Sequence, residues 1–157
     1  MAAAFSEEQL ERYARNIVLP GWGLEAQQKL QDARVLVIGL GGLGSPCLFQ
    51  LAAVGIGHLA IAEDDAIELS NLNRQILHNA ERLGRLKVES AAATLKALRP
   101  DLDLQPVAER FAPDNALDLI ADCDLFVDAS DNYETRFLAN DAAVIGKKRL
   151  VHGSVFR

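Results

Sequence analysis

Segments typical of buried strands alternate with segments typical of helices from residue 34 to the end of the 157-residue chain. The predicted strands are Arg34–Ile38, His58–Ala62, Leu102–Ala108, Asp124–Ala129 and Arg149–Val155. The helices predicted between them are Leu43–Val54, Arg85–Leu98, Asp114–Ala121 and Glu134–Ile145. Such alternation requires right-handed crossovers, so it predicts an α/β fold with a Rossmann-like, doubly wound and mostly parallel sheet.

Two helical segments precede the first strand. The stretch Ser6–Gln9 has the spacing of a capping box and begins a helix that runs to about Asn16. A break rich in proline and glycine follows at residues 20–23, and a second helix covers Leu24–Asp32. We therefore divide the chain into an N-terminal helical segment, residues 1–32, and a Rossmann-like nucleotide-binding domain, residues 33–157.

The composition excludes several classes of partner. A net charge of −6 and a pI near 5.0 leave no broad basic face for nucleic acid. The N-terminus has no basic segment before an apolar run, so we expect neither a secretory signal nor a membrane span. Cys47 and Cys123 are far apart and form no C-x-x-C pair, which indicates a reduced, cytoplasmic protein in which both thiols pack as small apolar groups.

A glycine-rich turn follows the first predicted strand. Residues 37–45 read VIGLGGLGS, and Gly39, Gly41 and Gly44 satisfy G-x-G-x-x-G. Acidic and polar residues follow two other strands, at residues 63–65 and 128–132. Ligands of doubly wound folds bind beyond the carboxyl ends of the strands, so these three segments predict one nucleotide site.

The nature of the nucleotide depends on the residues beyond the glycines. Glu63 can accept hydrogen bonds from a ribose, which NAD and ATP share. The polar stretch ELSNLNRQILH, residues 68–78, contains Arg74, and Lys87 follows it. A triphosphate needs such cations and a divalent metal, for which Asp131 is the candidate ligand. An NAD- or FAD-dependent oxidoreductase would use the glycines and leave these residues idle, and a nucleotide-binding or dimerisation module without turnover is a third reading.

Five short motifs, in this order and spacing, resemble those of MoeB/ThiF-type enzymes. These enzymes are bacterial relatives of ubiquitin-activating enzymes and adenylylate small sulfur-carrier proteins. The motifs are RYARNIVL, GLGGLG, ELSNLNRQ, the G-x-x-K of residues 84–87, and DASDN, and the resemblance runs from about Arg12 to Arg157. It implies ATP as the nucleotide.

The resemblance also implies roles for single residues. It places glycines on the ATP, Glu63 on the ribose, a wrapping segment around the nucleotide, and Asp131 on Mg²⁺ with Asn132 beside it. The implied nucleotide-binding residues are Gly39, Gly41, Gly42, Gly44, Glu63, Ser70, Asn71, Leu72, Asn73, Arg74, Lys87, Asp131 and Asn132. The implied catalytic residues are Arg15, Arg74, Lys87 and Asp131, of which Arg15 would reach into the partner's site of a homodimer.

The implied reaction is attack by the C-terminal glycine carboxylate of a ubiquitin-like sulfur carrier on the α-phosphate of ATP. A carboxylate is already ionised at neutral pH, so no general base is required, and we expect His58, His78 and His152 to be structural. Two features depart from the family pattern. Glu63 stands where the family usually has aspartate, and the C-terminal half that docks the carrier is absent, so a structural zinc site would need a longer chain.

Overall fold

The computed structural model describes residues 5–155, and the last two residues of the predicted nucleotide-binding domain lie outside them. Within this range five strands form one sheet in the order β3–β2–β1–β4–β5. All neighbouring strands pair in parallel. The strands are β1 (Arg34–Ile38), β2 (His58–Ala62), β3 (Asp103–Val107), β4 (Leu125–Asp128) and β5 (Arg149–His152). The predicted fold class is confirmed, although β5 ends at His152 instead of Val155.

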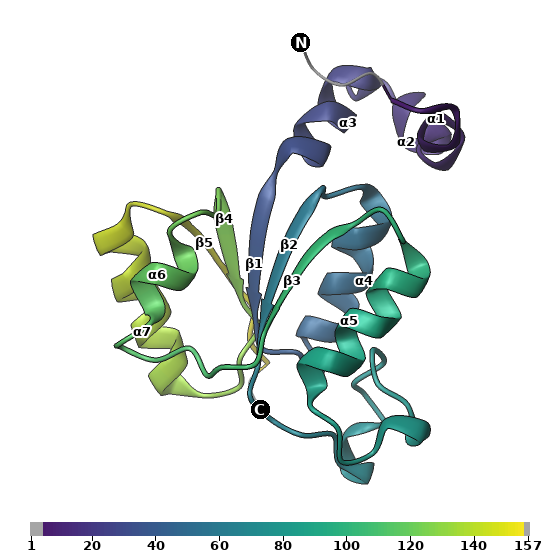
Figure 1. Ribbon diagram of the computed structural model, residues 1–157. Helices are drawn as coiled ribbons and strands as arrows, with labels where there is room; N and C mark the ends of the chain where they lie inside the picture. The colour runs from purple at the N-terminus through teal and green to yellow at the C-terminus, as the bar shows by residue number, and fades with distance from the viewer. Residues whose placement is uncertain (1–4, 156–157) are drawn as a thin grey trace.

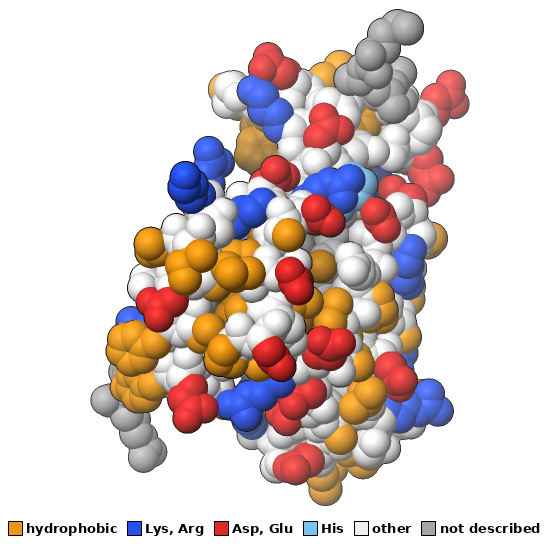
Figure 2. Space-filling view, turned by 60° about the vertical axis from the view of Figure 1, so that its left-hand side comes forward, with side chains coloured by type: hydrophobic (Ala, Val, Ile, Leu, Met, Phe, Trp, Pro, Cys, Tyr) orange, Lys and Arg blue, Asp and Glu red, His pale blue; other side chains and the backbone are white. Residues whose placement is uncertain are grey.

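Helices cover both faces of the sheet (Figure 1). One face carries α4 (Gly44–Val54) and α5 (Lys87–Leu98), and the other carries α6 (Ala116–Ile120) and α7 (Tyr133–Gly146). A separate cluster of buried apolar side chains lies on each face. Further apolar side chains are exposed on the side that carries α6 and α7 (Figure 2). The chain winds outward in opposite directions from β1 and β4, so a crevice opens at the carboxyl ends of these two strands.

The N-terminal helices lie beyond the amino ends of the strands (Figure 1). They are α1 (Glu7–Arg12), α2 (Ala14–Ile17) and α3 (Gly23–Asp32). The single helix predicted up to Asn16 is therefore two, because the chain turns at Tyr13 to bury that ring against Gly55. Gln27, fully buried on α3, donates a hydrogen bond of 2.8 Å to the Val54 carbonyl and ties the segment to the end of α4.

The polar stretch after β2 forms a long connection with two short 3₁₀ helices, η1 (Leu69–Asn71) and η2 (Ala80–Arg82). An antiparallel bridge between Ala66 and Leu86 closes its base, so the connection begins and ends at the same place. None of the helices within residues 5–155 has the length and apolar character needed to cross a membrane.

Candidate nucleotide site

A cavity of about 680 Å³ lies at the carboxyl ends of the strands. This volume is within the usual range for a small-molecule site, roughly 300–1,000 Å³. Eight of the residues predicted to bind the nucleotide line it, namely Gly39, Gly41, Gly42, Glu63, Arg74, Lys87, Asp131 and Asn132. The topology has brought the ends of four strands, β1, β2, β4 and β5, and the beginnings of three helices, α4, α5 and α7, around one space.

Two glycines give the turn after β1 its shape. Gly39 has a φ of +89°, and a Cβ there would lie 2.9 Å from the Ala129 carbonyl oxygen. A Cβ at Gly44 would lie 1.9 Å from the Gly39 carbonyl oxygen, so α4 could not begin so close to β1 with any other residue at this position. Gly44 does not line the cavity. Its part in the site is to bring the helix close to the turn.

Gly41 and Gly42 face the cavity, and both meet the polar connection. The nearest neighbour of a Cβ at Gly41 would be Gln75 Nε2 at 3.6 Å, and at Gly42 it would be Arg74 Cδ at 3.4 Å. These are ordinary contact distances, so the glycines leave the backbone of the turn open to a ligand. Backbone N–H groups just before a helix are suited to bind phosphate.

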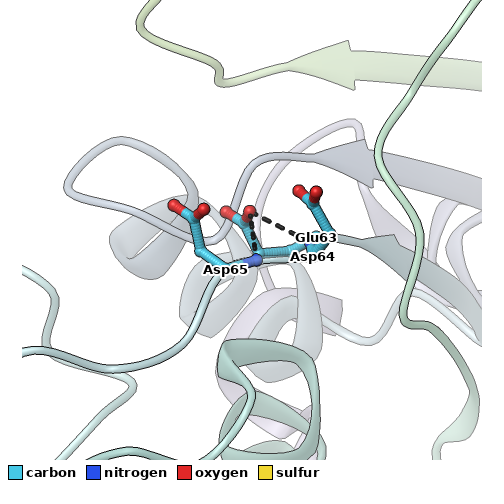
Figure 3. Close-up of side chains that lie close together, drawn as sticks. All are labelled: Glu63, Asp64 and Asp65. Atoms are coloured by element: carbon cyan, nitrogen blue, oxygen red, sulfur yellow. Dashed lines mark hydrogen bonds between the residues drawn. The ribbon is translucent and has the colours of Figure 1, made fainter.

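Glu63 joins the end of β2 to the glycine turn. Its Oε2 accepts a hydrogen bond of 3.1 Å from the Leu40 N–H, and its Oε1 accepts from the N–H groups of Asp64 and Asp65, both at 3.2 Å. Figure 3 shows the carboxylate of Glu63 beside the backbone of the two aspartates. Each carboxylate oxygen has two lone pairs, so Oε2 can still accept a ribose hydroxyl.

Glu63, Asp64 and Asp65 form the one group of three potential metal ligands found among residues 5–155 (Figure 3). Two of the three carboxylates are already engaged, because Glu63 accepts backbone N–H groups and Asp65 accepts from Lys87. These contacts stabilise the negative charge without a metal ion.

Lys87 begins α5 and is buried, although a lysine side chain is seldom buried without a partner. Its Nζ donates a hydrogen bond of 2.7 Å to Asp65 Oδ2 and lies 4.0 Å from Glu63 Oε2. Burial of an ammonium group requires such partners. The side chain still lines the cavity, so the ammonium can approach a phosphate there.

Fewer residues of the polar connection line the cavity than predicted. Arg74 is exposed at the mouth of the cavity, where its Nη1 donates to the Ser70 carbonyl and to Asn73 Oδ1. Asn71 is buried, and its Oδ1 accepts the Glu68 N–H, which holds η1 together. Four predicted residues of the polar connection do not line the cavity: Ser70, Asn71, Leu72 and Asn73.

The turn after β4 forms another wall of the cavity. Asp131 and Asn132 are exposed, and Asn132 caps α7 by accepting the Thr135 N–H at 2.8 Å. Asp128 is fully buried, and its Oδ1 accepts from the N–H and hydroxyl of Ser130. Its Oδ2 lies 2.7 Å from His152 Nδ1. Asp131 is therefore presented at the cavity by a turn whose base is buried.

The residues present fit a nucleoside triphosphate and a divalent ion. The glycine turn offers N–H groups, and Lys87 and Arg74 offer positive charge to phosphate oxygens. Asp131 is a single carboxylate, which suits Mg²⁺, since this ion is usually held by one or two carboxylates together with substrate phosphates. The residues would thus complete an ion's coordination only with a phosphate bound.

Several cavity residues were missed by the sequence analysis. Gln75 is only 4% exposed, and its Oε1 makes no hydrogen bond within the described part of the chain. Gln75 lies in the ELSNLNRQ motif, but the resemblance implies no role for it. Asp64, Asp65 and Ser130 also line the cavity, and they lie in the strand-end segments 63–65 and 128–132 that the sequence predicts to form the site. Other lining residues have no sequence signal of their own, because separate segments bring them to the cavity: Arg110, Phe111, Tyr133, Thr135, Arg136, His152, Ser154 and Val155.

Two of the three histidines make contacts that agree with structural roles. His58 Nδ1 lies 2.7 Å from Asp103 Oδ2 at the amino end of the sheet, and this contact lowers the pKa of Asp103. His78 is buried between Ser90 and the Leu40 carbonyl, and burial lowers its pKa. Burial also raises the pKa of the Cys47 and Cys123 thiols, which disfavours their reactive thiolate forms.

Arg15 lies on α2, at the end of the molecule opposite the cavity (Figure 1). The neighbouring Arg12 donates to the Leu98 carbonyl at the end of α5, which places this segment beside the amino ends of the strands. Arg15 is exposed there and does not line the cavity. It therefore cannot act on a ligand in the cavity of its own chain in this arrangement.

Curated relatives match almost all of the chain. A probable adenylyltransferase/sulfurtransferase MoeZ from Mycobacterium tuberculosis is 44% identical over 99% of this chain and 40% of its own length. A sulfur carrier protein adenylyltransferase from Thermus thermophilus is 43% identical over 98% and 56%, respectively. A SAMP-activating enzyme E1 from Haloferax volcanii is 43% identical over 100% and 58%. The chain thus spans between 40% and 58% of the length of these relatives.

A solved structure agrees with these relatives in fold. The chain superposes on E. coli tRNA N6-threonylcarbamoyladenosine dehydratase, TcdA, in complex with ATP, with a TM-score of 0.89 and 26% identity. The match covers 98% of this chain and 65% of that one. Residues 13–157 match the ThiF family. The chain belongs to the ThiF family.

Proposed function

We propose that the chain binds ATP–Mg²⁺ in this cavity and adenylylates the C-terminal carboxylate of a small ubiquitin-like sulfur-carrier protein, releasing pyrophosphate. The observation that supports this most is that Lys87, Arg74 and Asp131 line the same cavity as the glycine turn. A dinucleotide would need the glycine turn but neither cation. The ATP complex of TcdA, a structure of the same fold, supports the choice of nucleotide.

In this proposal the residues act by alignment and charge. Glu63 and the N–H groups of the glycine turn orient the ribose and phosphates, while Lys87 and Arg74 offset charge on the α-phosphate and the departing pyrophosphate. The carrier's carboxylate attacks the α-phosphorus, and the bond from that phosphorus to the bridging oxygen breaks. Asp131 would hold the Mg²⁺, which supplies charge neutralisation on phosphate oxygens.

The carrier as acyl substrate is suggested by the relatives' names, one of which is a sulfur carrier protein adenylyltransferase. The proposed reaction is best tested by pyrophosphate exchange into ATP with a ubiquitin-like carrier that ends in glycine. We expect exchange only when the carrier is present. Binding of ATP without exchange would indicate the nucleotide-binding module, and tighter binding of NAD than of ATP–Mg²⁺ in calorimetry would indicate an oxidoreductase.

We also propose a homodimer in which Arg15 completes the site of the other chain. Arg15 lies far from its own cavity, and exposed apolar side chains follow it, with Val18 73%, Leu19 51% and Leu24 51% exposed. Exposed apolar side chains of this kind are suited to an interface. In a closed dimer both chains would contribute the same surface to the interface, so both sites would be completed together.

Mixing two inactive variants tests the trans arrangement. A heterodimer of Arg15→Ala and Asp131→Ala chains would have one site with both defects and one with neither. Part of the activity should therefore return on mixing. If subunits exchange and no activity returns, Arg15 serves its own chain and this part of the proposal is wrong.

A further inference from the structure

Three side chains from outside the glycine turn hold the peptide groups on either side of Leu40. The Leu40 N–H donates to Glu63 Oε2 at 3.1 Å. Its carbonyl oxygen accepts from Ser45 Oγ at 3.3 Å and from His78 Nε2 at 3.1 Å. Ser45 and Glu63 adjoin the turn through α4 and β2. His78 comes from the polar connection and is 7% exposed.

The partners of His78 determine which nitrogen carries its proton. A carbonyl oxygen can only accept, so Nε2 must be protonated toward Leu40. In the neutral ring Nδ1 is then an acceptor, and it lies 3.1 Å from Ser90 Oγ, which can donate to it. The charged groups facing the ring are Lys87, Arg82 and Glu63, two of them cationic. The surroundings thus favour a neutral imidazole with both nitrogens engaged.

Ser90 is in turn fixed on α5. It is 2% exposed, and Arg82 Nη1 donates to its carbonyl at 2.8 Å and to Thr94 Oγ1 at 2.7 Å. Ser90 lies three residues after Lys87, so the two side chains belong to the same first turn of the helix. His78 is therefore a bridge from the backbone of the glycine turn to the helix turn that carries Lys87.

We propose that His78 is a positioning residue: it keeps the N–H groups of the glycine turn and the Lys87 ammonium in one fixed arrangement, so that both meet the phosphates of the same nucleotide. The inference rests on the proposed function, in that ATP is taken as the ligand. His78 itself does not line the cavity and acts only through the Leu40 carbonyl and Ser90.

The first experiment compares ATP–Mg²⁺ and adenosine binding by calorimetry. His78→Leu removes both hydrogen bonds at similar volume and should weaken ATP–Mg²⁺ binding about 10- to 100-fold, the scale of a small misplacement of binding groups. Adenosine has no phosphates, so its binding should change much less. His78→Gln keeps an N–H donor near the Nε2 position and should recover most of the ATP affinity. His58→Gln, at the opposite end of the sheet, is the matched control and should bind as wild type.

The second experiment does not depend on the nucleotide. Hydrogen exchange should become faster in residues 40–44 and 86–90 together in His78→Leu, and stay slow in His78→Gln. A folded His78→Leu chain with wild-type ATP affinity, or with unchanged exchange in both segments, would overturn the inference. If His78→Leu does not fold, Ser90→Ala should show the same faster exchange in both segments. Unchanged exchange in Ser90→Ala would then overturn the inference. A wild-type chain that binds no ATP would instead overturn the proposed function, because the exchange result stands without the nucleotide.

Discussion

The two walls of the cavity are built in different ways. The turn after β1 is held from outside, by Glu63, Ser45 and His78, and the Leu40 side chain within it is fully buried. The turn after β4 is held mainly by one buried carboxylate, that of Asp128, and its outer residues Asp131 and Asn132 are exposed. The first wall presents backbone groups in a fixed geometry, which lowers the cost of ordering on binding. The second wall presents exposed side chains to the cavity, those of Asp131 and Asn132.

From this difference we expect that a substitution in the first wall mainly lowers the free energy of unfolding. Gly44→Ala places a methyl group 1.9 Å from a backbone oxygen that cannot move away, so we expect a loss of about 3 kcal/mol or more in the free energy of unfolding. Gly41→Ala meets only the end of a side chain at 3.6 Å and should cost much less. Urea unfolding of both variants measures the difference. Similar losses for the two glycines would contradict a packing role specific to Gly44.

The two cations should separate binding from folding. Loss of either should weaken ATP–Mg²⁺ binding or adenylylation by roughly 2–4 kcal/mol, the scale of a lost charge-stabilising donor in a closed site. Arg74 is exposed, so Arg74→Ala should leave unfolding unchanged. Lys87→Met leaves the largely buried Glu63 carboxylate without the cation that lies 4.0 Å away, and should also destabilise the fold. Calorimetry and urea unfolding on the same samples measure both quantities, and wild-type activity in Arg74→Ala would refute its phosphate role.

Asp131 tests the second wall. Asp131→Ala should weaken binding of ATP–Mg²⁺ far more than binding of adenosine, because the carboxylate would act through the metal on the phosphates. Stability should change little, since the side chain is exposed. Titration of both ligands by calorimetry compares the effects. Equal losses for the two ligands would mean that Asp131 has a structural role, and the metal assignment would then be abandoned.

The smallest expected effect is a pH dependence of stability in the first wall. Burial lowers the pKa of His78 in the folded chain, whereas the unfolded chain takes up this proton near pH 6.5. Stability should therefore be complete above pH 6.5 and fall as the pH drops toward the lowered pKa, by at most about 1.4 kcal/mol per pH unit. His78→Gln removes this contribution. Urea unfolding at several pH values should give a shallower decline for the variant, and parallel curves would exclude His78 as its source.

The sequence alone determined the parallel, doubly wound sheet, because alternating apolar strands and helices leave few other ways to bury both faces. It also determined which segments meet at the cavity, since the glycine turn, Glu63 and Asp131 each follow a strand that the topology brings to the same edge. These features depend on local pattern and on the order of elements. That is why eight of the residues predicted to bind the nucleotide do line the cavity.

Only the tertiary structure decided which polar residues face the cavity and which hold its walls. Asn71 and Arg74 lie in one motif, yet Asn71 is buried within η1 and Arg74 lines the cavity. Lys87 is buried because Asp65, from another segment, supplies its partner. The burial and pairing of a side chain depend on segments distant in sequence, and spacing along the chain does not encode those contacts.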